Sequence, residues 1–361
     1  MKILIITRYS YPRQSPRAFR TAELTEQLVK MGHDVTLYTV HGRYDYSDYE
    51  KQTGIKMRNI ETRFATSGPD GCQKSSLFDR FMSHFFKRVL FWPQCEFHFV
   101  VNKIIKENPN VDMLITIALP HSFHSGAAKA KKKYPDIFPK TWICDCGDPF
   151  MLNPFFNFPQ YMKRFEDMWC SMCDYISVPT ATSYKGYYPQ YWNKIRVIPQ
   201  GFDFNKTPIA EYVPNKIPTF LFTGTIHSNR SPKKFMDYLL TLDMDYKFYL
   251  YTGSAVDKQY NELSNGKIEV RKGYSRKDIV NQCSKMDFLI NIKNINDLQT
   301  PSKLIDYGIS KRPILSISDD FVEIEQFMQF VNGDYSSQYH VDNLDDYKIE
   351  NVANKFLSLA K

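Results

Sequence analysis

Two segments in the C-terminal half of the chain each combine the start of a predicted helix with residues that bind phosphate. In the first, Phe222–Lys234, Gly224 follows a buried apolar run and Ser231-Pro232 opens a helix. Glycine lets the backbone approach a ligand closely, and a helix start offers free amides and a positive dipole end to an anion. Arg230 adds a guanidinium fork and Lys234 a point charge. The alternative is an ordinary strand–turn–helix unit with exposed basic residues.

The second segment, Gln299–Gly308, carries the more complete pattern. Thr300 suits the cap of a helix and Pro301 its first position. The amides of Ser302 and Lys303 then lack acceptors within the helix and stabilise an anion there. Asp306 lies one turn further on the face of Ser302, where a carboxylate can accept both hydroxyls of a ribose. A capped helix with a surface carboxylate is the alternative.

Two anion-binding helix starts in one domain fit a diphosphate better than either fits alone, so we expect both to converge on a single pyrophosphate group. Thr7–Pro16, which follows the first predicted strand, contains no glycine, and the Gly-rich signature of a dinucleotide site is therefore absent there. A Walker A sequence is absent as well, which argues against an ATPase or kinase of that type.

In the N-terminal half, polar residues follow predicted strands, at the edge where open α/β sheets bind ligands. His121 and His124 follow the apolar run Val111–Ala118, and either could contact a donor sugar or move a proton. A capping or surface role is an equal alternative for each histidine. The loop Tyr9–Arg20 should reach the same edge, so that Arg13 and Arg17 would meet an acceptor phosphate or form a basic surface.

These candidate sites require two domains of alternating strands and helices. The chain has 361 residues, enough for two domains. Buried apolar runs alternate with helical patterns, which predicts parallel doubly wound sheets and hence two Rossmann-like α/β domains with a cleft between them. We place the domains at 1–200 and 201–361, with a Pro-punctuated linker after residue 200. Whether the last helix packs back on the N-terminal domain is left open.

Composition narrows the classes of partner. The formal net charge of +8 suits a nucleotide diphosphate, an anionic membrane face or nucleic acid, or reflects a Lys-rich surface. No nucleic-acid motif accompanies it. Among the seven cysteines, Cys170 and Cys173 lie three residues apart, but no second pair of matching spacing accompanies them. We therefore expect reduced thiols and no metal. We expect no signal peptide and no membrane-spanning segment.

The segment Leu77–Trp92 mixes aromatic and basic residues. It could lie in an anionic membrane interface, which would suit a lipid-linked acceptor. A core helix with a basic outer face is the alternative.

The chain resembles the family 4 retaining glycosyltransferases, which have the GT-B fold. The resemblance covers most of the chain and is carried by four stretches: Asp174-Tyr-Ile-Ser-Val-Pro-Thr, Ile195-Arg-Val-Ile-Pro-Gln-Gly-Phe-Asp, Phe222-Thr-Gly, and Pro301-Ser-Lys-Leu-Ile-Asp-Tyr-Gly-Ile-Ser-Lys-Arg-Pro-Ile. The last stretch is the most specific. The family's first motif glutamate is replaced, because Leu298 stands at its place and Asp297 is the nearest acid.

The resemblance implies residue roles. The donor-binding residues would be Gly224, Arg230, Lys234, Tyr274, Ser302, Lys303, Leu304 and Asp306, with Tyr274 against the base and Asp306 at the ribose. Asp145 and Asp148 resemble the acidic residue at this place in related enzymes and would be catalytic, with loop capping as the alternative. From their positions after predicted strands, we assign His121 to catalysis and Arg13, Arg17 and His124 to the acceptor side.

The implied reaction moves a sugar from a nucleotide-diphosphate sugar to a hydroxyl of a glycan or lipid-linked glycan, with retention and without a cofactor. It would serve cell-surface polysaccharide or glycolipid synthesis in the cytoplasm, at the inner membrane face. Two alternatives remain: a sugar-nucleotide epimerase of the same fold, and a non-catalytic nucleotide-sugar binding protein.

Overall fold

The computed structural model describes residues 1–65, 68–69, 93–153, 157–226, 231–256, 259–272, 275–293 and 303–361. The chain divides into two compact units. The first comprises Met1–Phe202 and Asp346–Lys361, and the second comprises Asp203–Asp345. The sequence-based boundary after residue 200 lies close to this division, but residues 346–361 join the first unit.

The first unit is built on a parallel sheet of seven strands in the order β3-β2-β1-β4-β5-β6-β7. The strands are β1 (Lys2–Ile6), β2 (Asp34–Thr39), β3 (Lys56–Asn59), β4 (Met113–Ile117), β5 (Thr141–Asp145), β6 (Tyr175–Val178) and β7 (Ile195–Val197). The central strands β4 and β5 are buried along their whole length, as continuous apolar runs predict.

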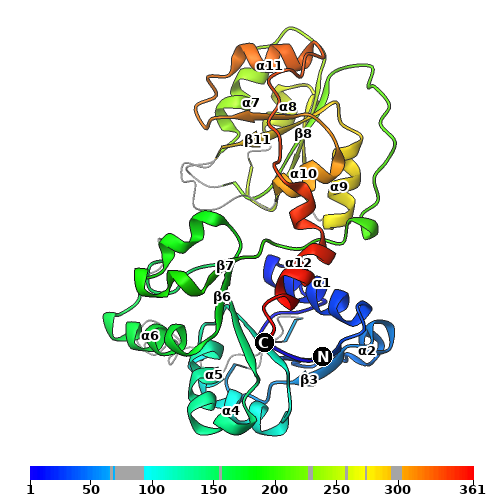
Figure 1. Cartoon of the computed structure of the whole chain (residues 1–361). Coiled ribbons are helices and arrows are strands. Elements are labelled where there is room, and N and C mark those ends of the chain that lie inside the picture. The colour runs from blue at the N-terminus through cyan, green and yellow to red at the C-terminus, as the bar shows by residue number, and fades with distance from the viewer. Residues whose placement is uncertain are drawn as a thin grey trace. The chain divides into compact units, whose positions relative to one another are not determined.

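Helices cover both faces of this sheet (Figure 1). On one face lie α1 (Pro16–Lys30), α2 (Ser47–Thr53) and α12 (Ile349–Leu357). On the other lie α4 (Phe97–Glu107), α5 (Ser122–Lys133) and α6 (Lys163–Met172). The α12 helix packs on α1 and buries Val352 and Phe356, which is why the C-terminal residues belong to this unit.

The second unit carries a parallel sheet of five strands in the order β10-β9-β8-β11-β12. The strands are β8 (Thr219–Thr223), β9 (Lys247–Tyr251), β10 (Ile268–Arg271), β11 (Phe288–Ile292) and β12 (Ile314–Ile317). The helices are α7 (Lys233–Leu239), α8 (Gln259–Leu263), α9 (Arg276–Ser284), α10 (Lys303–Ser310) and α11 (Ile324–Val331). Both strand orders are those of doubly wound sheets, so the predicted fold class is confirmed.

Local signals placed most element ends within a residue or two. Ser15 caps α1 by accepting from the amide of Ala18, and Gly32 stands just beyond the helix with φ of 82°. The short helices α2 and α8 were not predicted. The spacing of Met162, Phe165, Trp169 and Cys173 predicts one apolar helix face in α6. This prediction is partly wrong, because Phe165 is exposed whereas Glu166 is buried. Leu77–Trp92 lies outside the described residues.

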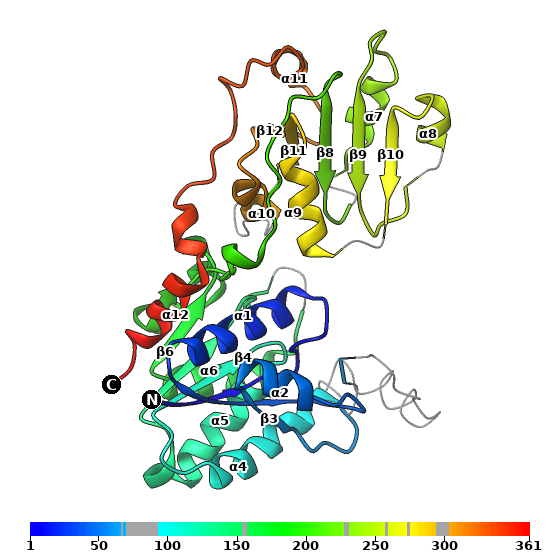
Figure 2. The same cartoon turned by 90° about the vertical axis from the view of Figure 1, so that its right-hand side faces the viewer.

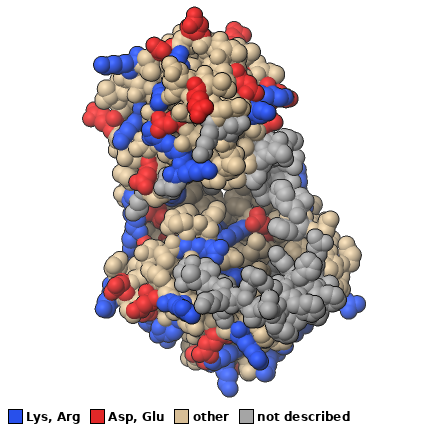
Figure 3. Space-filling model, turned by 180° about the vertical axis from the view of Figure 1, so that it is seen from behind, with Lys and Arg blue, Asp and Glu red and all other residues tan. Residues whose placement is uncertain are grey.

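Lys and Arg are interspersed with Asp and Glu over the described surface seen in Figure 3. The described helices include none that is long and apolar enough to cross a membrane.

The buried carboxyl of Glu166 makes the stability of the first unit sensitive to pH. Glu166 is 1% exposed and accepts from the amide of Met151 at 3.2 Å. Burial raises the pKa of Glu166 to about 7. The folded protein therefore keeps this proton to a higher pH than the unfolded chain does. The contribution to stability is complete below the unfolded pKa and is lost as pH rises through about 7.

We expect Glu166→Gln to remove this loss and to stabilise the protein by up to about 3 kcal/mol at about pH 8. Urea unfolding between about pH 5 and pH 8 measures the effect. The exposed Glu107→Gln is the matched control and should keep the wild-type pH profile. An equal pH profile for Glu166→Gln and wild type would show that Glu166 is not the titrating group.

Candidate functional site

The second unit has a crevice at the point where its strand order reverses. From β8 the chain crosses to β9 on one side, and from β11 it crosses to β12 on the other. β8 pairs with β9 along five residues, but it pairs with β11 only through Phe220–Phe288 and Leu221–Leu289. The two strands therefore separate toward their carboxyl ends. This is the place where open α/β sheets bind ligands.

The hydroxyl of Tyr307 fills the gap between these strands. It accepts from the amide of Thr223 at 2.9 Å and donates to the carbonyl of Ile290 at 3.1 Å. Both backbone groups lie beyond the last residues at which β8 and β11 pair, and a buried group left unpaired would be costly. Tyr307 is fully buried, so it fixes α10 against the ends of β8 and β11.

Gly224 turns the chain directly after β8. Its φ is 133°, a conformation that side-chain-bearing residues rarely adopt, and its amide donates to the carbonyl of Tyr251. The predicted position of Gly224 at a strand end thus corresponds to a turn that requires glycine.

The helix α10 brings three of the predicted donor-binding residues to this edge of the sheet. Lys303 and Leu304 lie in its first turn and are both buried. The ammonium of Lys303 lies 4.1 Å from the centre of the Phe222 ring, a cation–π distance that ties the helix start to β8.

Asp306 is 9% exposed and pairs with Arg276, which begins α9. The Nε and Nη2 atoms of Arg276 donate to the same oxygen, Oδ1 of Asp306, at 2.8 and 2.6 Å. Burial raises the pKa of Asp306, and the Arg276 charge opposes this shift. The pair orients the carboxylate at the end of the first turn of α10, and both bonds from Arg276 go to one of its two oxygens.

The helix starts predicted to converge belong to opposite faces of the sheet. The buried side chains of α7 pack with α11 over Phe220 and Phe222. The crossover from β11 to β12 runs in the opposite direction to that from β8 to β9, and because both are right-handed it places α10 on the other face. On that face α10 packs against α9, and Figure 2 shows α9 in front of the sheet. Both helices follow strands that end at the same edge, so they flank the crevice rather than share one face.

Lys234, predicted to contact the donor diphosphate, has a carboxylate as its partner in the structure. It lies in the first turn of α7, where its ammonium pairs with Asp320 on the exposed surface. Arg230, Tyr274 and Ser302, together with Thr300, Pro301 and Leu298, lie outside the described residues.

In the first unit, Asp145 is a structural group. It is completely buried at the end of β5 and accepts two hydrogen bonds of 2.6 Å from Arg20 of α1. Ser177 of β6 donates to the same carboxylate at 2.6 Å. Although burial opposes ionisation, the Arg20 charge and these hydrogen bonds lower the pKa of Asp145. The carboxylate has no exposed surface for a substrate, which contradicts the predicted catalytic role.

His124 also lies in the interior, contrary to the predicted acceptor role. It is fully buried, with Nδ1 2.7 Å from the hydroxyl of Thr116 and Nε2 3.3 Å from Sγ of Cys146. Burial lowers the pKa of His124 well below its ordinary value. Its place on the sheet-facing side of α5 explains the difference.

His121 is 2% exposed and stacks on Phe150. Its Nε2 lies 3.2 Å from the carbonyl of Asp148, which can only accept, so Nε2 carries the proton. Burial lowers the pKa of His121 to about 4, which keeps the ring neutral near pH 7. Its Nδ1 finds no partner among the described residues. The catalytic role of His121 stays a prediction.

Asp148 pairs with Arg17 at 2.7 Å and is partly exposed, so both remain able to contact a ligand. Arg13 stands apart, with its guanidinium 4.4 Å from the centre of the Tyr9 ring. Within the described residues, no group of three or more His, Cys, Asp or Glu side chains is arranged to hold a metal ion.

Tyr307 and Arg276 were missed by sequence reasoning. Tyr307 falls on the apolar face of its helix, where an aromatic residue is typical of a core. The pairing of Arg276 with Asp306 joins positions 30 residues apart, and no local pattern indicates it.

No protein-family model and no curated protein sequence matches the chain. Solved structures match it along its whole length. A glycosyltransferase from Rickettsia africae ESF-5 gives a TM-score of 0.63 at 14% identity, over 100% of this chain and 94% of that chain. The lipopolysaccharide outer core galactosyltransferase WaaB gives 0.61 at 14% identity, over 99% of each chain. Anabaena HepE in complex with UDP gives 0.59 at 10% identity, over 100% of this chain and 95% of that chain. The chain therefore has the GT-B fold of glycosyltransferases.

We expect Tyr307→Phe to destabilise the second unit by about 1–3 kcal/mol, because the amide of Thr223 and the carbonyl of Ile290 lose their partner. The same substitution should weaken the binding of any ligand held at the start of α10. Unfolding by urea and calorimetric titration of UDP measure the two effects. Tyr335→Phe, near the first residue of β11, is the matched control. Unchanged stability in Tyr307→Phe would contradict the bridging role.

Proposed function

We propose that this protein is a glycosyltransferase that uses a nucleotide-diphosphate sugar as its donor, and that the β8–β11 crevice holds the donor's diphosphate and ribose. The observation that carries the proposal is the arrangement at α10, where Tyr307 fixes a helix start beside two diverging strands and Asp306 lies one turn below it. The shared GT-B fold supports the same assignment.

The helix start would bind the β-phosphate. The amides of Ser302, Lys303 and Leu304 belong to the first turn or directly precede it, where amides lack acceptors within the helix. Such amides would donate to an anion, and the helix dipole adds a favourable charge. Gly224, across the crevice, lets the backbone of the β8 turn approach the phosphates.

Asp306 would bind the ribose. Because both bonds from Arg276 go to Oδ1, the second oxygen is the acceptor that we assign to the ribose hydroxyls. Its ion pair with Arg276 favours the charged carboxylate against the effect of burial and orients it. UDP is the first candidate nucleotide, since the structure of Anabaena HepE was solved with UDP. Tyr274 is proposed to lie against the base.

The chemistry required is stabilisation of the departing diphosphate. Negative charge develops on the β-phosphate as the bond to the sugar breaks, so donors aimed at that phosphate act mainly in the transition state. We propose that Arg230, Lys234 and the amides at the start of α10 supply this stabilisation, without a metal cofactor. Lys234 would exchange its exposed ion pair with Asp320 for the phosphate.

The finer assignments rest on the family resemblance of Pro301–Pro313. We propose retention of the anomeric configuration and a hydroxyl acceptor on a glycan or lipid-linked glycan, in cell-surface polysaccharide or glycolipid synthesis at the cytoplasmic membrane face. In the first unit we propose His121 and Asp148 near the reacting groups, with Arg13 and Arg17 toward the acceptor.

A double-mutant cycle between Asp306 and the ribose tests the proposed donor site. Wild type should bind UDP more tightly than 2′-deoxy-UDP or 3′-deoxy-UDP by roughly 1.5–3 kcal/mol, the scale of a hydrogen bond to a charged group. Asp306→Asn should reduce UDP affinity and abolish this preference, because the carboxylate acceptor is lost. Calorimetric titration measures each affinity.

The matched control is Asp245→Asn, which removes a largely exposed carboxylate from the same unit and should keep the preference for UDP. Preservation of the preference in a folded Asp306→Asn would remove Asp306 from the ribose site. Absence of any UDP, GDP or ADP binding to wild type would contradict the proposed donor class.

Measurements of turnover distinguish sugar transfer from the two alternatives, an epimerase and a non-catalytic binding protein. Incubation with UDP-sugars and hydroxyl acceptors should release UDP and form a glycoside. An epimerised sugar nucleotide formed without acceptor would identify an epimerase. Tight donor binding without turnover across acceptors would favour a binding protein.

A further inference from the structure

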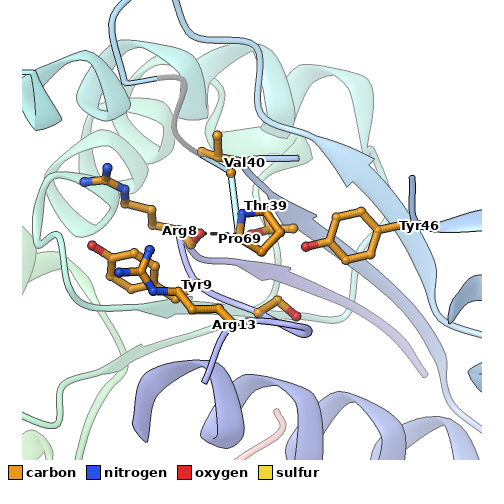
Figure 4. A pocket seen from close by; sticks show the side chains of 9 residues that line it. Arg8, Tyr9, Arg13, Thr39, Val40, Tyr46 and Pro69 are labelled. Carbon is orange, nitrogen blue, oxygen red and sulfur yellow. Dashed lines mark hydrogen bonds between the residues drawn. The ribbon is translucent and has the colours of Figure 1, made fainter. Parts of the chain in front are cut away.

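Two guanidinium groups gather at the carboxyl end of β1 in the first unit. The Cζ atoms of Arg8 and Arg13 lie 5.3 and 4.4 Å from the centre of the same ring, that of Tyr9. Figure 4 shows both guanidinium groups on the Tyr9 side of a narrow hollow. The Cζ atom of Arg8 also lies 5.9 Å from the centre of the Phe97 ring. Aromatic rings attract cations only weakly, so these contacts do not offset two charges.

Neither guanidinium is neutralised by a described carboxylate. By contrast, Arg17 and Arg20, which follow in the chain, pair with Asp148 and Asp145. Burial lowers the pKa of Arg8, and the charge of Arg13 lowers it further. Two like charges that are close together and partly desolvated are unfavourable without a counter-ion. The protein therefore maintains an electropositive spot at a cost in stability.

Two polar atoms at this spot are buried without a partner. Nε of Arg8 and the hydroxyl of Ser10 have no hydrogen-bond partner among the described residues, and Ser10 is 2% exposed. Such atoms are rare in folded proteins, and an absent ligand is one explanation of them. Both residues line the hollow together with Arg13. The unpaired charges and the unpaired donors therefore occur at one place.

The backbone around the hollow is fixed by a hydrogen bond and by close packing. The hydroxyl of Thr39 donates to the carbonyl of Arg8 at 3.1 Å, which fixes the end of β1 against β2. Gly68 lines the opposite wall, where a Cβ atom would lie 2.3 Å from the carbonyl oxygen of His41. Only glycine permits this approach, so the wall is built from tightly packed backbone.

We propose that Arg8, Ser10 and Arg13 form a subsite for a phosphoryl group carried by the acceptor. Two guanidinium forks and a hydroxyl match the several oxygens of a phosphate. A phosphate dianion balances both charges, whereas a carboxylate would leave one guanidinium unpaired. The assignment to the acceptor rests on the proposed function, because the donor diphosphate is assigned to the second unit and an anion site on the first unit then serves the other substrate.

The test measures inorganic phosphate by ³¹P NMR line broadening in the presence of saturating UDP, so that the proposed donor site is occupied. Wild type should bind phosphate, and Arg13→Gln and Arg8→Gln should each weaken binding by about tenfold or more, the scale of a charged hydrogen bond. Ser10→Ala, which removes little volume, should weaken it less. Arg164→Gln, a charge-matched change at an exposed site of the same unit, should leave the affinity unchanged.

Equal affinities in wild type, Arg13→Gln and Arg8→Gln would overturn the subsite, and so would an equal loss in Arg164→Gln, which would indicate bulk charge. If Arg8→Gln loses affinity for phosphate because the protein unfolds, Arg13→Gln decides the question, since the Arg13 side chain lies in a loop. If UDP fails to bind while phosphate binding still depends on both arginines, the anion subsite stands and the proposed donor function falls. If UDP binds and the affinity for phosphate is the same in both variants as in wild type, the proposed subsite is wrong and the proposed donor function stands.

Two further probes distinguish the source of the phosphoryl group. Methyl phosphate represents a soluble phosphorylated acceptor, and phosphatidylcholine vesicles with and without phosphatidic acid represent a membrane-bound one. Arginine-dependent binding of methyl phosphate alone supports a soluble acceptor. Arginine-dependent binding of the phosphatidic acid vesicles supports a lipid-linked acceptor, and arginine-independent binding of both contradicts the subsite.

Discussion

The second unit depends on one buried hydroxyl. At the point where the sheet reverses its order, β8 and β11 part after two paired positions, and the backbone groups beyond them need partners in the interior. The Tyr307 hydroxyl serves the amide of Thr223 and the carbonyl of Ile290 at once. This arrangement lets the strands diverge without unpaired groups, and it places the start of α10 at the mouth of the crevice. The separation of the strands and the position of the helix start are thus one structural feature.

Paired charges orient side chains at the sheet edge of each unit. Arg276 orients Asp306 in the second unit, and Arg20 joins α1 to β5 and β6 through Asp145 and Ser177 in the first. The carboxylates of these buried pairs accept hydrogen bonds from the protein itself, and the pairs hold neighbouring helices and strands together. Arg8 and Arg13 lie on the same β1–α1 segment as Arg17 and Arg20 but receive no described carboxylate. Which of these arginines are paired is therefore set by where the carboxylates at and after the end of β5 lie.

The sequence predicted the sheets well because buried parallel strands are continuous apolar runs, as Met113–Ile117 and Phe288–Ile292 are. The cap at Ser15 and the turn at Gly224 were also readable, since both depend on local backbone chemistry. Roles that depend on tertiary neighbours were not readable. Asp145 and His124 follow or face a strand end like ligand-binding residues, yet both are enclosed by partners from distant segments. Likewise, no local pattern distinguishes Arg13 from Arg17.

The central claim is that a nucleoside diphosphate binds against the start of α10. Hydrogen–deuterium exchange with and without UDP tests it most directly, because bound phosphate protects the amides that it accepts from. The account predicts exchange slowed by at least about tenfold at Lys303–Asp306 and in the turn at Gly224 when UDP saturates the protein. Protection confined to other segments, with these amides unchanged while UDP is bound, would contradict the account.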